Sequence, residues 1–126
     1  MPSSTKKFFS NSLIFDVWEN VYEPSDDSVL FAESLDVNEG QLVLDMGTGC
    51  GILGILSAKK ASAVWAVDIN PHAILCAKAN ARINRVVDKM SFVQSNLFSA
   101  FRENTKFDLI LFNAPYLPTE SNKKDS

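Results

Sequence analysis

The sequence contains at residues 41–60 the stretch QLVLDMGTGCGILGILSAKK. Residues 41–45 form a short apolar run, which predicts a β-strand. Residues 46–51 alternate glycine with other residues, and residues 52–60 have the length and composition of a helix. The stretch therefore predicts a strand, a glycine-rich turn and a helix, which is the repeating unit of parallel α/β sheets.

The same alternation continues along the chain. A second apolar, β-branched run at residues 63–67 stops at Asp68. Asn70 and Pro71 then predict the start of a helix, because Asn caps helices and Pro suits their first position. The other elements expected are the end of that helix near Asn84, strands at 90–94 and 107–112, a short helix at 97–103, and an upstream helix from Pro24 to about residue 38. This order predicts right-handed crossovers and a parallel sheet covered on both faces, with ligands at the carboxyl ends of the strands.

The composition predicts one small soluble domain. The chain has 126 residues, of which 46% are hydrophobic and 21% are charged, and these values argue against disordered, fibrous and repeat proteins. The longest run without a charge, Met46 to Ala58, is well short of the roughly 18 to 20 residues that a bilayer requires. Residues 1–10 lack the apolar core of a secretory signal, so we expect a cytoplasmic protein with no membrane segment.

Cysteine usage and charge narrow the function classes further. Cys50 and Cys76 form no Cys-x-x-Cys pair, and His72 is the single histidine, so the sequence predicts buried thiols and no metal site. Residues 1–58 carry nine acids and two lysines, whereas residues 59–126 carry six acids and ten bases. Because the bases are scattered, this asymmetry does not amount to a nucleic-acid footprint.

Three parts are expected along the chain. Residues 1–20 form a leader, and the segment Phe8 to Val21 is apolar but without an evident period. Residues 21–118 form the folded domain. Residues 119–126 form a polar tail with the composition of a frayed terminus.

Carboxylates and glycines stand at the carboxyl ends of the first two strands. Asp45 is followed by Gly47, Gly49 and Gly51, whose backbone can pass close to a ligand while the next helix offers free N–H groups. Asp68 ends the second strand, where its carboxylate can accept both hydroxyls of a ribose. The two strand ends together predict a site for a nucleoside-containing cofactor.

A dinucleotide site is an alternative, because Gly49, Gly51 and Gly54 satisfy the pattern G-x-G-x-x-G. Two features count against it. The matching glycines begin four residues beyond Asp45, and a carboxylate so close to the turn would repel a pyrophosphate. Asp68 does not discriminate, since nicotinamide and adenosyl cofactors both carry a ribose.

The end of the fourth predicted strand is more specific. The motif FNAPY at residues 112–116 places an amide, a constrained backbone and an aromatic ring at one point. With residues 45–51 and Asp68, it resembles class I S-adenosylmethionine-dependent methyltransferases. The stretch VYEPSDDS at residues 21–28 resembles the segment before the first strand in HemK-like release-factor glutamine methyltransferases of archaeal and eukaryotic type. The resemblance spans about residues 21–119 and implies a Rossmann-like three-layer α/β sandwich, of which the chain carries the first four parallel strands.

The resemblance implies that S-adenosylmethionine is the cofactor. Asp45, Gly47 and Gly49 would then line its methionine part. Asp68 would bind its ribose, and Ser28 matches a hydroxyl near its carboxylate.

Asn96 and Leu97 match the pair that contacts adenine in that family. Members mostly have Asp where Asn96 stands, and Asn keeps one acceptor but loses the charge, which predicts weaker binding. The complete set of cofactor-binding positions implied is Ser28, Asp45, Met46, Gly47, Thr48, Gly49, Asp68, Ile69, Asn96, Leu97 and Asn113.

The catalytic positions implied are those of the last motif. The acceptor in the family is a planar amide or aromatic amine, whose nitrogen lone pair is delocalised. The Asn113 side-chain oxygen and the Ala114 carbonyl can accept its two N–H bonds, while Tyr116 packs against its plane. The usual motif is Asn-Pro-Pro-Tyr. Ala114 is still restricted by Pro115 but leaves Asn113 freer, which predicts a reduced rate rather than changed chemistry.

The resemblance also implies partners. The favoured acceptor is a glutamine amide of a translation release factor, and proteins of this type often work with a small zinc-binding activator subunit. The class I sheet has seven strands in the order 3-2-1-4-5-7-6, so the strand at 107–112 is expected to be an open apolar edge. Three explanations for such an open edge compete. A second copy or another subunit completes the sheet, the chain is a truncated or degenerate gene product, or it is an expressed piece of a longer protein.

Other functions stay open beside glutamine methylation. Adenine N6 methylation of nucleic acid uses the same motif, although the balanced charge disfavours duplex DNA. A catalytically impaired module that acts by binding a partner is another possibility, because Asn96 and Ala114 depart from the usual residues of the family. A dinucleotide oxidoreductase is the least favoured.

Overall fold

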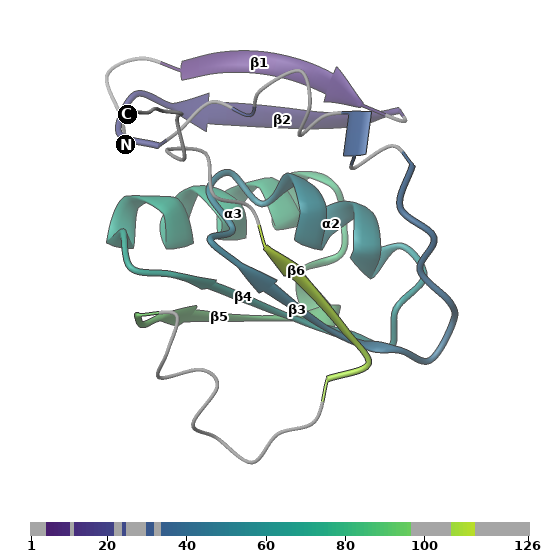
Figure 1. Ribbon diagram of the computed structural model, residues 1–126. Coiled ribbons are helices and arrows are strands. Elements are labelled where there is room, and N and C mark those ends of the chain that lie inside the picture. Colours follow the sequence, from purple (N-terminus) through teal and green to yellow (C-terminus); the bar gives the residue numbers. More distant parts are fainter. Residues whose placement is uncertain are drawn as a thin grey trace, which may run out of the picture.

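The fold is built on a parallel sheet of four strands, seen in a computed structural model that describes residues 5–10, 12–21, 24, 30–31, 34–96 and 107–112 (Figure 1). The strands lie in the order β5-β4-β3-β6, and every neighbouring pair is parallel. Their bounds are β3 Leu42–Met46, β4 Ala63–Asp68, β5 Met90–Gln94 and β6 Leu109–Phe112. This is the order expected for the first four strands of the predicted class, so the α/β prediction is confirmed.

Two helices follow the central strands. They are α2 Ile52–Ala58 and α3 Pro71–Ile83, and a short 3-10 helix, η1 Val87–Lys89, leads into β5. Asn70 caps α3, since its side chain accepts a hydrogen bond from the His72 N–H, and Pro71 occupies the first helical turn as predicted. Figure 1 shows α2 and α3 on one face of the sheet, between the sheet and the strand pair β1–β2.

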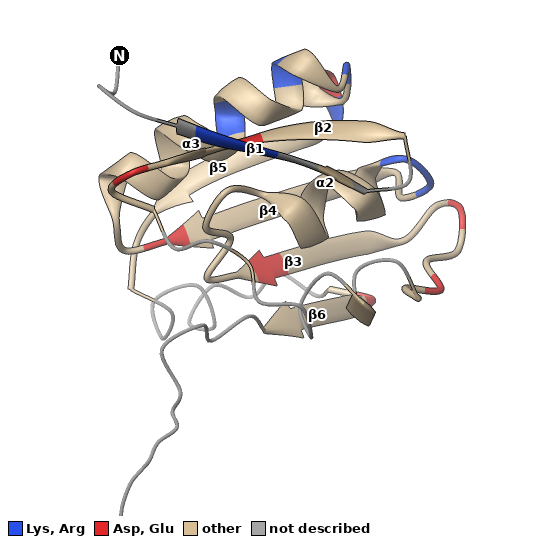
Figure 2. Ribbon diagram, turned by 90° about the horizontal axis from the view of Figure 1, so that it is seen from above, with Lys and Arg blue, Asp and Glu red and all other residues tan. Residues whose placement is uncertain are grey.

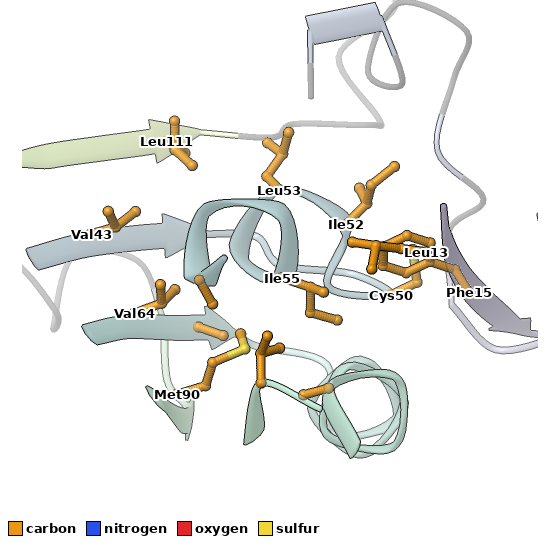
Figure 3. Packing of buried hydrophobic residues seen from close by; sticks show 14 of the residues in the cluster. Leu13, Phe15, Val43, Cys50, Ile52, Leu53, Ile55, Val64, Met90 and Leu111 are labelled. Atoms are coloured by element: carbon orange, nitrogen blue, oxygen red, sulfur yellow. The ribbon is translucent and has the colours of Figure 1, made fainter. Parts of the chain in front are cut away.

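The main core lies between the sheet and these helices. Val43 and Val64 of the sheet are fully buried against α2, whose Ile55 is fully buried as well (Figure 3). On the other face of the sheet, Leu44 and Val67 are buried in a second cluster. Because β3 is buried on both faces, its residues are apolar except for Asp45, which is typical of a central parallel strand.

Residues 5–10 and 13–18 form an antiparallel strand pair, here called the hairpin, that the sequence analysis missed. The hairpin consists of β1 Thr5–Ser10 and β2 Leu13–Trp18. Leu13, Phe15 and Val17 are buried, and Figure 3 shows the first two beside Cys50 and Ile52. The period of two is therefore present, but Ile14 and Trp18 on the opposite face are also apolar and hide it.

The structure also tests the strands and helices that the sequence predicts. The strands predicted at 41–45, 63–67, 90–94 and 107–112 all exist, shifted by no more than two residues at either end. The helix predicted over 52–60 ends at Ala58. The helix expected from Pro24 to about residue 38 is helical at Leu30 and Phe31, but Pro24 and residues 34–38 are not helical, so its predicted end is wrong. The helix expected at 97–103 lies outside the described residues.

The predicted state of the two thiols is confirmed. Cys50 and Cys76 are both free and buried. Within the described ranges, no helix is both long and apolar enough to cross a bilayer, and no group of three His, Cys, Asp or Glu side chains could hold a metal ion.

Candidate functional site

The glycine loop after β3 folds back onto the end of β4. The N–H groups of Gly47 and Thr48 both donate to the Val67 carbonyl, at 2.8 and 3.0 Å. Gly51 has φ +93°, and a Cβ there would lie 2.9 Å from Ile55 Cδ1. Gly49 has φ +56°, and a Cβ there would meet no atom within 4 Å. The loop is thus packed against helices at Gly51 and open to a ligand at Gly49.

Asp45 lies beneath this loop and is fully buried. Its Oδ2 accepts hydrogen bonds from the Thr48 hydroxyl at 2.7 Å and from the Gly54 N–H at 3.0 Å. Its Oδ1 has no hydrogen-bond partner among the described residues. Burial raises the pKa of this carboxyl from its ordinary value of 3.8 to about 6, the two hydrogen bonds oppose that rise, and Asp68 adds to it. Asp45 therefore links the loop to α2 through Oδ2, and its buried Oδ1 can still accept a hydrogen bond.

Asp68 ends β4 and is held by two backbone donors. Its Oδ2 accepts from the Gly49 N–H at 2.9 Å, and its Oδ1 accepts from the Asn70 N–H at 3.0 Å. Each oxygen keeps acceptor capacity for one more donor, so the carboxylate can still accept two hydroxyls. Figure 2 shows acidic residues at the ends of both β3 and β4, at the same edge of the sheet.

The end of β5 forms a third side of the candidate site, next to the end of β4. The Ser95 N–H donates to the Asp68 carbonyl at 3.0 Å, and the Gln94 amide donates to the Ile69 carbonyl at 3.4 Å. The side chain of Ile69 is 66% exposed and the following Asn96 is exposed too. Ile69 therefore offers an exposed apolar surface next to the Asp68 carboxylate.

These residues fit an adenosyl cofactor. The Asp68 carboxylate, which is held by two N–H groups, can accept hydrogen bonds from the two hydroxyls of a ribose. The exposed side chain of Ile69 can pack against a planar adenine ring, and the open space at Gly49 allows the methionine part to approach the backbone. Asp45 Oδ1, which has no hydrogen-bond partner in the described part of the chain, suits a buried N–H or O–H group. The dinucleotide alternative fits less well. In that alternative the backbone at Gly51 would be open to a phosphate, but the space beside Gly51 is filled by Ile55.

The structure describes part of the predicted site. It brings together eight positions: Asp45, Met46, Gly47, Thr48, Gly49, Asp68, Ile69 and Asn96. Met46 and Thr48 are both buried, and the Thr48 hydroxyl donates to Asp45. The predicted positions outside the described residues are Ser28, Leu97, Asn113, Ala114, Pro115 and Tyr116.

The sequence analysis missed a hollow that lies beside Asn70, where the chain leaves the hairpin. Residues 19–21 reach the start of α3, where Glu19, Asn20, Val21 and Asn70 line a hollow of about 240 Å³. The Asn70 amide donates to the Asn20 carbonyl at 2.9 Å. The only local signal was Asn70 itself, which reads as a helix cap and says nothing about a distant strand.

Comparison with known proteins finds a matching family and several relatives. Residues 22–125 match the family described as Methyltransferase small domain. A provisionally named protein N5-glutamine methyltransferase of Methanocaldococcus jannaschii is 47% identical over 107 residues, which is 82% of this chain and 51% of that protein. A release factor glutamine methyltransferase of Fusobacterium nucleatum is 35% identical over 83% of this chain and 31% of its own length.

A relative with a different acceptor also matches. A tRNA1(Val) (adenine(37)-N6)-methyltransferase of a Flavobacteriaceae bacterium is 30% identical over 86% of this chain and 47% of its own length. The chain thus spans about half the length of the curated relatives it matches, or less.

Solved structures share the fold. The crystal structure of a tRNA m1G37 methyltransferase from M. jannaschii superposes with a TM-score of 0.76 at 26% identity, over 88% of this chain and 35% of that one. M. jannaschii TYW2 in complex with AdoMet superposes with a TM-score of 0.65 at 20% identity, over 73% of this chain and 43% of that one, a likeness of fold alone.

Proposed function

The chain belongs to the Methyltransferase small domain family, and we propose that it binds S-adenosylmethionine where β3, β4 and β5 end and takes part in methyl transfer to nitrogen. The observation that carries the proposal is the Asp68 carboxylate, fixed by the N–H groups of Gly49 and Asn70 with capacity left on both oxygens. When bound, the cofactor supplies an electrophilic methyl group on its sulfonium.

The role of this part of the chain is to bind and orient the methyl donor. Asp68 accepts the ribose hydroxyls, Ile69 and Asn96 border the adenine, and the loop at Gly49 borders the methionine part. Asp45 offers its free oxygen to the buried side of that loop. Because Asp68 is already held by two donors, little reorganisation is needed when the cofactor binds.

The favoured methyl acceptor is the side-chain amide of a protein glutamine. Two glutamine methyltransferases among the relatives support this choice, one of which acts on a release factor by its name. Asn113 and the Ala114 carbonyl would accept the two N–H bonds of that amide, with Tyr116 against its plane. A translation release factor is then the partner protein.

An adenine amine is the second candidate acceptor. It presents the same planar N–H₂ group, and the tRNA adenine-N6 methyltransferase among the relatives favours it. The two acceptors are separated by incubating the chain with methyl-labelled S-adenosylmethionine and either a release factor or tRNA. Label in protein alone supports the first acceptor, and label in tRNA alone supports the second.

The control for this assay is an exposed carboxylate away from the site. Asp88→Asn in η1 should leave transfer unchanged, whereas Asp68→Asn should slow it strongly at limiting cofactor, because the cofactor binds more weakly. Cofactor binding without transfer to either acceptor would instead support a module that acts by binding.

Two further partners follow from the sequence resemblance. A zinc-binding activator subunit is one. The other is a second copy that pairs along β6, which among the described strands bonds only to β3 and exposes Ile110 and Phe112. Sedimentation of the chain alone distinguishes self-association from a monomer.

A further inference from the structure

Two asparagines of α3 hold the hairpin as a neighbouring strand would. Asn80 Oδ1 accepts from the Asp16 N–H at 2.8 Å, and Asn80 Nδ2 donates to the Asp16 carbonyl at 2.8 Å. Asn84 makes the same pair of bonds with Ile14, at 3.0 and 2.8 Å. Residues two apart on a strand thus bond residues one turn apart on a helix. The register of β2 on α3 is thereby fixed.

A third asparagine stands at the other end of α3, next to the candidate site. Asn70 Nδ2 donates to the Asn20 carbonyl at 2.9 Å, just beyond β2. Its backbone N–H donates to Asp68 Oδ1, and the other Asp68 oxygen accepts from Gly49. An uninterrupted chain of hydrogen bonds therefore runs from the hairpin, through Asn70 and Asp68, to the glycine loop.

The bond to Asn20 is not needed for helix capping. Capping uses only the Asn70 Oδ1, which accepts from the His72 N–H at 2.9 Å. A serine hydroxyl caps about as well but cannot also reach a distant carbonyl. The Nδ2 donor therefore has a separate effect: it fixes the backbone of Asn70, from which Asp68 receives one of its two hydrogen bonds.

We propose that Asn70 is a positioning residue of the methyl-donor site, which ties the end of the hairpin to Asp68 and so holds the carboxylate ready for the ribose. The proposal rests on the function proposed above. It also gives the hairpin a role in the site: residues 19–21, which line the hollow beside Asn70, form a wall whose place is set by this bond.

The test compares Asn70→Ser with Asn70→Ala and with Asn84→Ser. Asn70→Ser keeps the cap and loses the bond to Asn20, whereas Asn70→Ala loses both. Asn84→Ser removes two hairpin bonds at the far end of α3 without touching Asp68. Thermal unfolding, the Kd of S-adenosylmethionine by calorimetry, and amide hydrogen exchange of Gly49 in ligand-free protein are measured for each.

Asn70→Ser should unfold close to the wild-type temperature. It should nevertheless bind S-adenosylmethionine about fivefold more weakly, as expected for one lost hydrogen bond. Its Gly49 amide should exchange about fivefold faster, because the Asp68 acceptor is less firmly held. Asn70→Ala should show both effects and a lower unfolding temperature. Asn84→Ser should lower the unfolding temperature with the Kd and the Gly49 exchange unchanged.

A wild-type Kd and wild-type Gly49 exchange in Asn70→Ser would overturn the proposal, since Asn70 would then be only a cap. Equal weakening by Asn84→Ser would also overturn it, because any loosening of the hairpin would suffice. If the wild-type chain binds no donor, the proposed function fails, and the exchange of Gly49 alone still decides whether Asn70 positions Asp68.

Discussion

Replacement of Asp45 by asparagine should make the protein more stable at neutral pH and leave its stability unchanged in acid. The carboxyl is fully buried, and one of its oxygens has no partner among the described residues. Its pKa of about 6 in the folded protein, against 3.8 ordinarily, is equivalent to about 3 kcal/mol. The folded state holds the proton more tightly, so the unfolding free energy falls as the pH rises from about 4 to about 6.

Asparagine resembles the neutral form of Asp45, and its carbonyl can accept the bonds from Thr48 and Gly54. The variant should therefore match the wild type near pH 4 and exceed it by up to about 3 kcal/mol above pH 6. Urea unfolding of both proteins at pH 4.5, 6 and 7.5 measures the difference, from which titrations common to both cancel.

The control is Asp88→Asn, an exposed carboxylate that should give no pH-dependent difference. A difference between Asp45→Asn and wild type that is the same at pH 4.5 and 7.5 would refute the reasoning, because the carboxyl would then not titrate in this range. If the variant is more stable at pH 7.5 but binds the donor more weakly, the buried charge is kept for function at a cost in stability.

Three further predictions concern the loop, the thiols and the acceptor motif. Gly51→Ala should destabilise by about 2 to 4 kcal/mol in urea unfolding, since φ is +93° and Ile55 and Ala77 fill the space, whereas Gly49→Ala should cost about 1 to 2 kcal/mol and chiefly weaken donor binding. Burial raises the pKa of Cys50 to about 12 and of Cys76 to about 11, so both should resist a thiol reagent at pH 8 until the chain unfolds; rapid labelling of folded protein would contradict this. Ala114→Pro should raise the rate of methyl transfer, and an unaltered rate would argue against a loosened acceptor site.

The elements that could be predicted from sequence are those with local signals. Asn70 and Pro71 mark the start of α3 in two adjacent residues, and each parallel strand is a run of apolar residues that ends at a polar one or a turn. The β1–β2 hairpin was missed because apolar residues occupy both of its faces, so burial and not hydrophobicity distinguishes Phe15 from Ile14.

The candidate site could likewise be predicted from the sequence only in part. The carboxylates of Asp45 and Asp68 could be placed at strand ends by topology, since neighbouring parallel strands end at one edge of a sheet. The difference between their environments could not be predicted. Asp45 is buried, and one of its oxygens has no partner among the residues that the structure describes, whereas Asp68 accepts hydrogen bonds from two separate turns. Such differences arise from packing between distant segments, which residue spacing does not encode.

Calorimetric titration of the chain with S-adenosylmethionine, beside Asp68→Ala, tests the central claim most directly. The account predicts saturable binding that weakens by about 10- to 100-fold in the variant, because the ribose loses hydrogen bonds to a charged group. Binding that does not depend on Asp68, or no binding by a demonstrably folded chain, would contradict it.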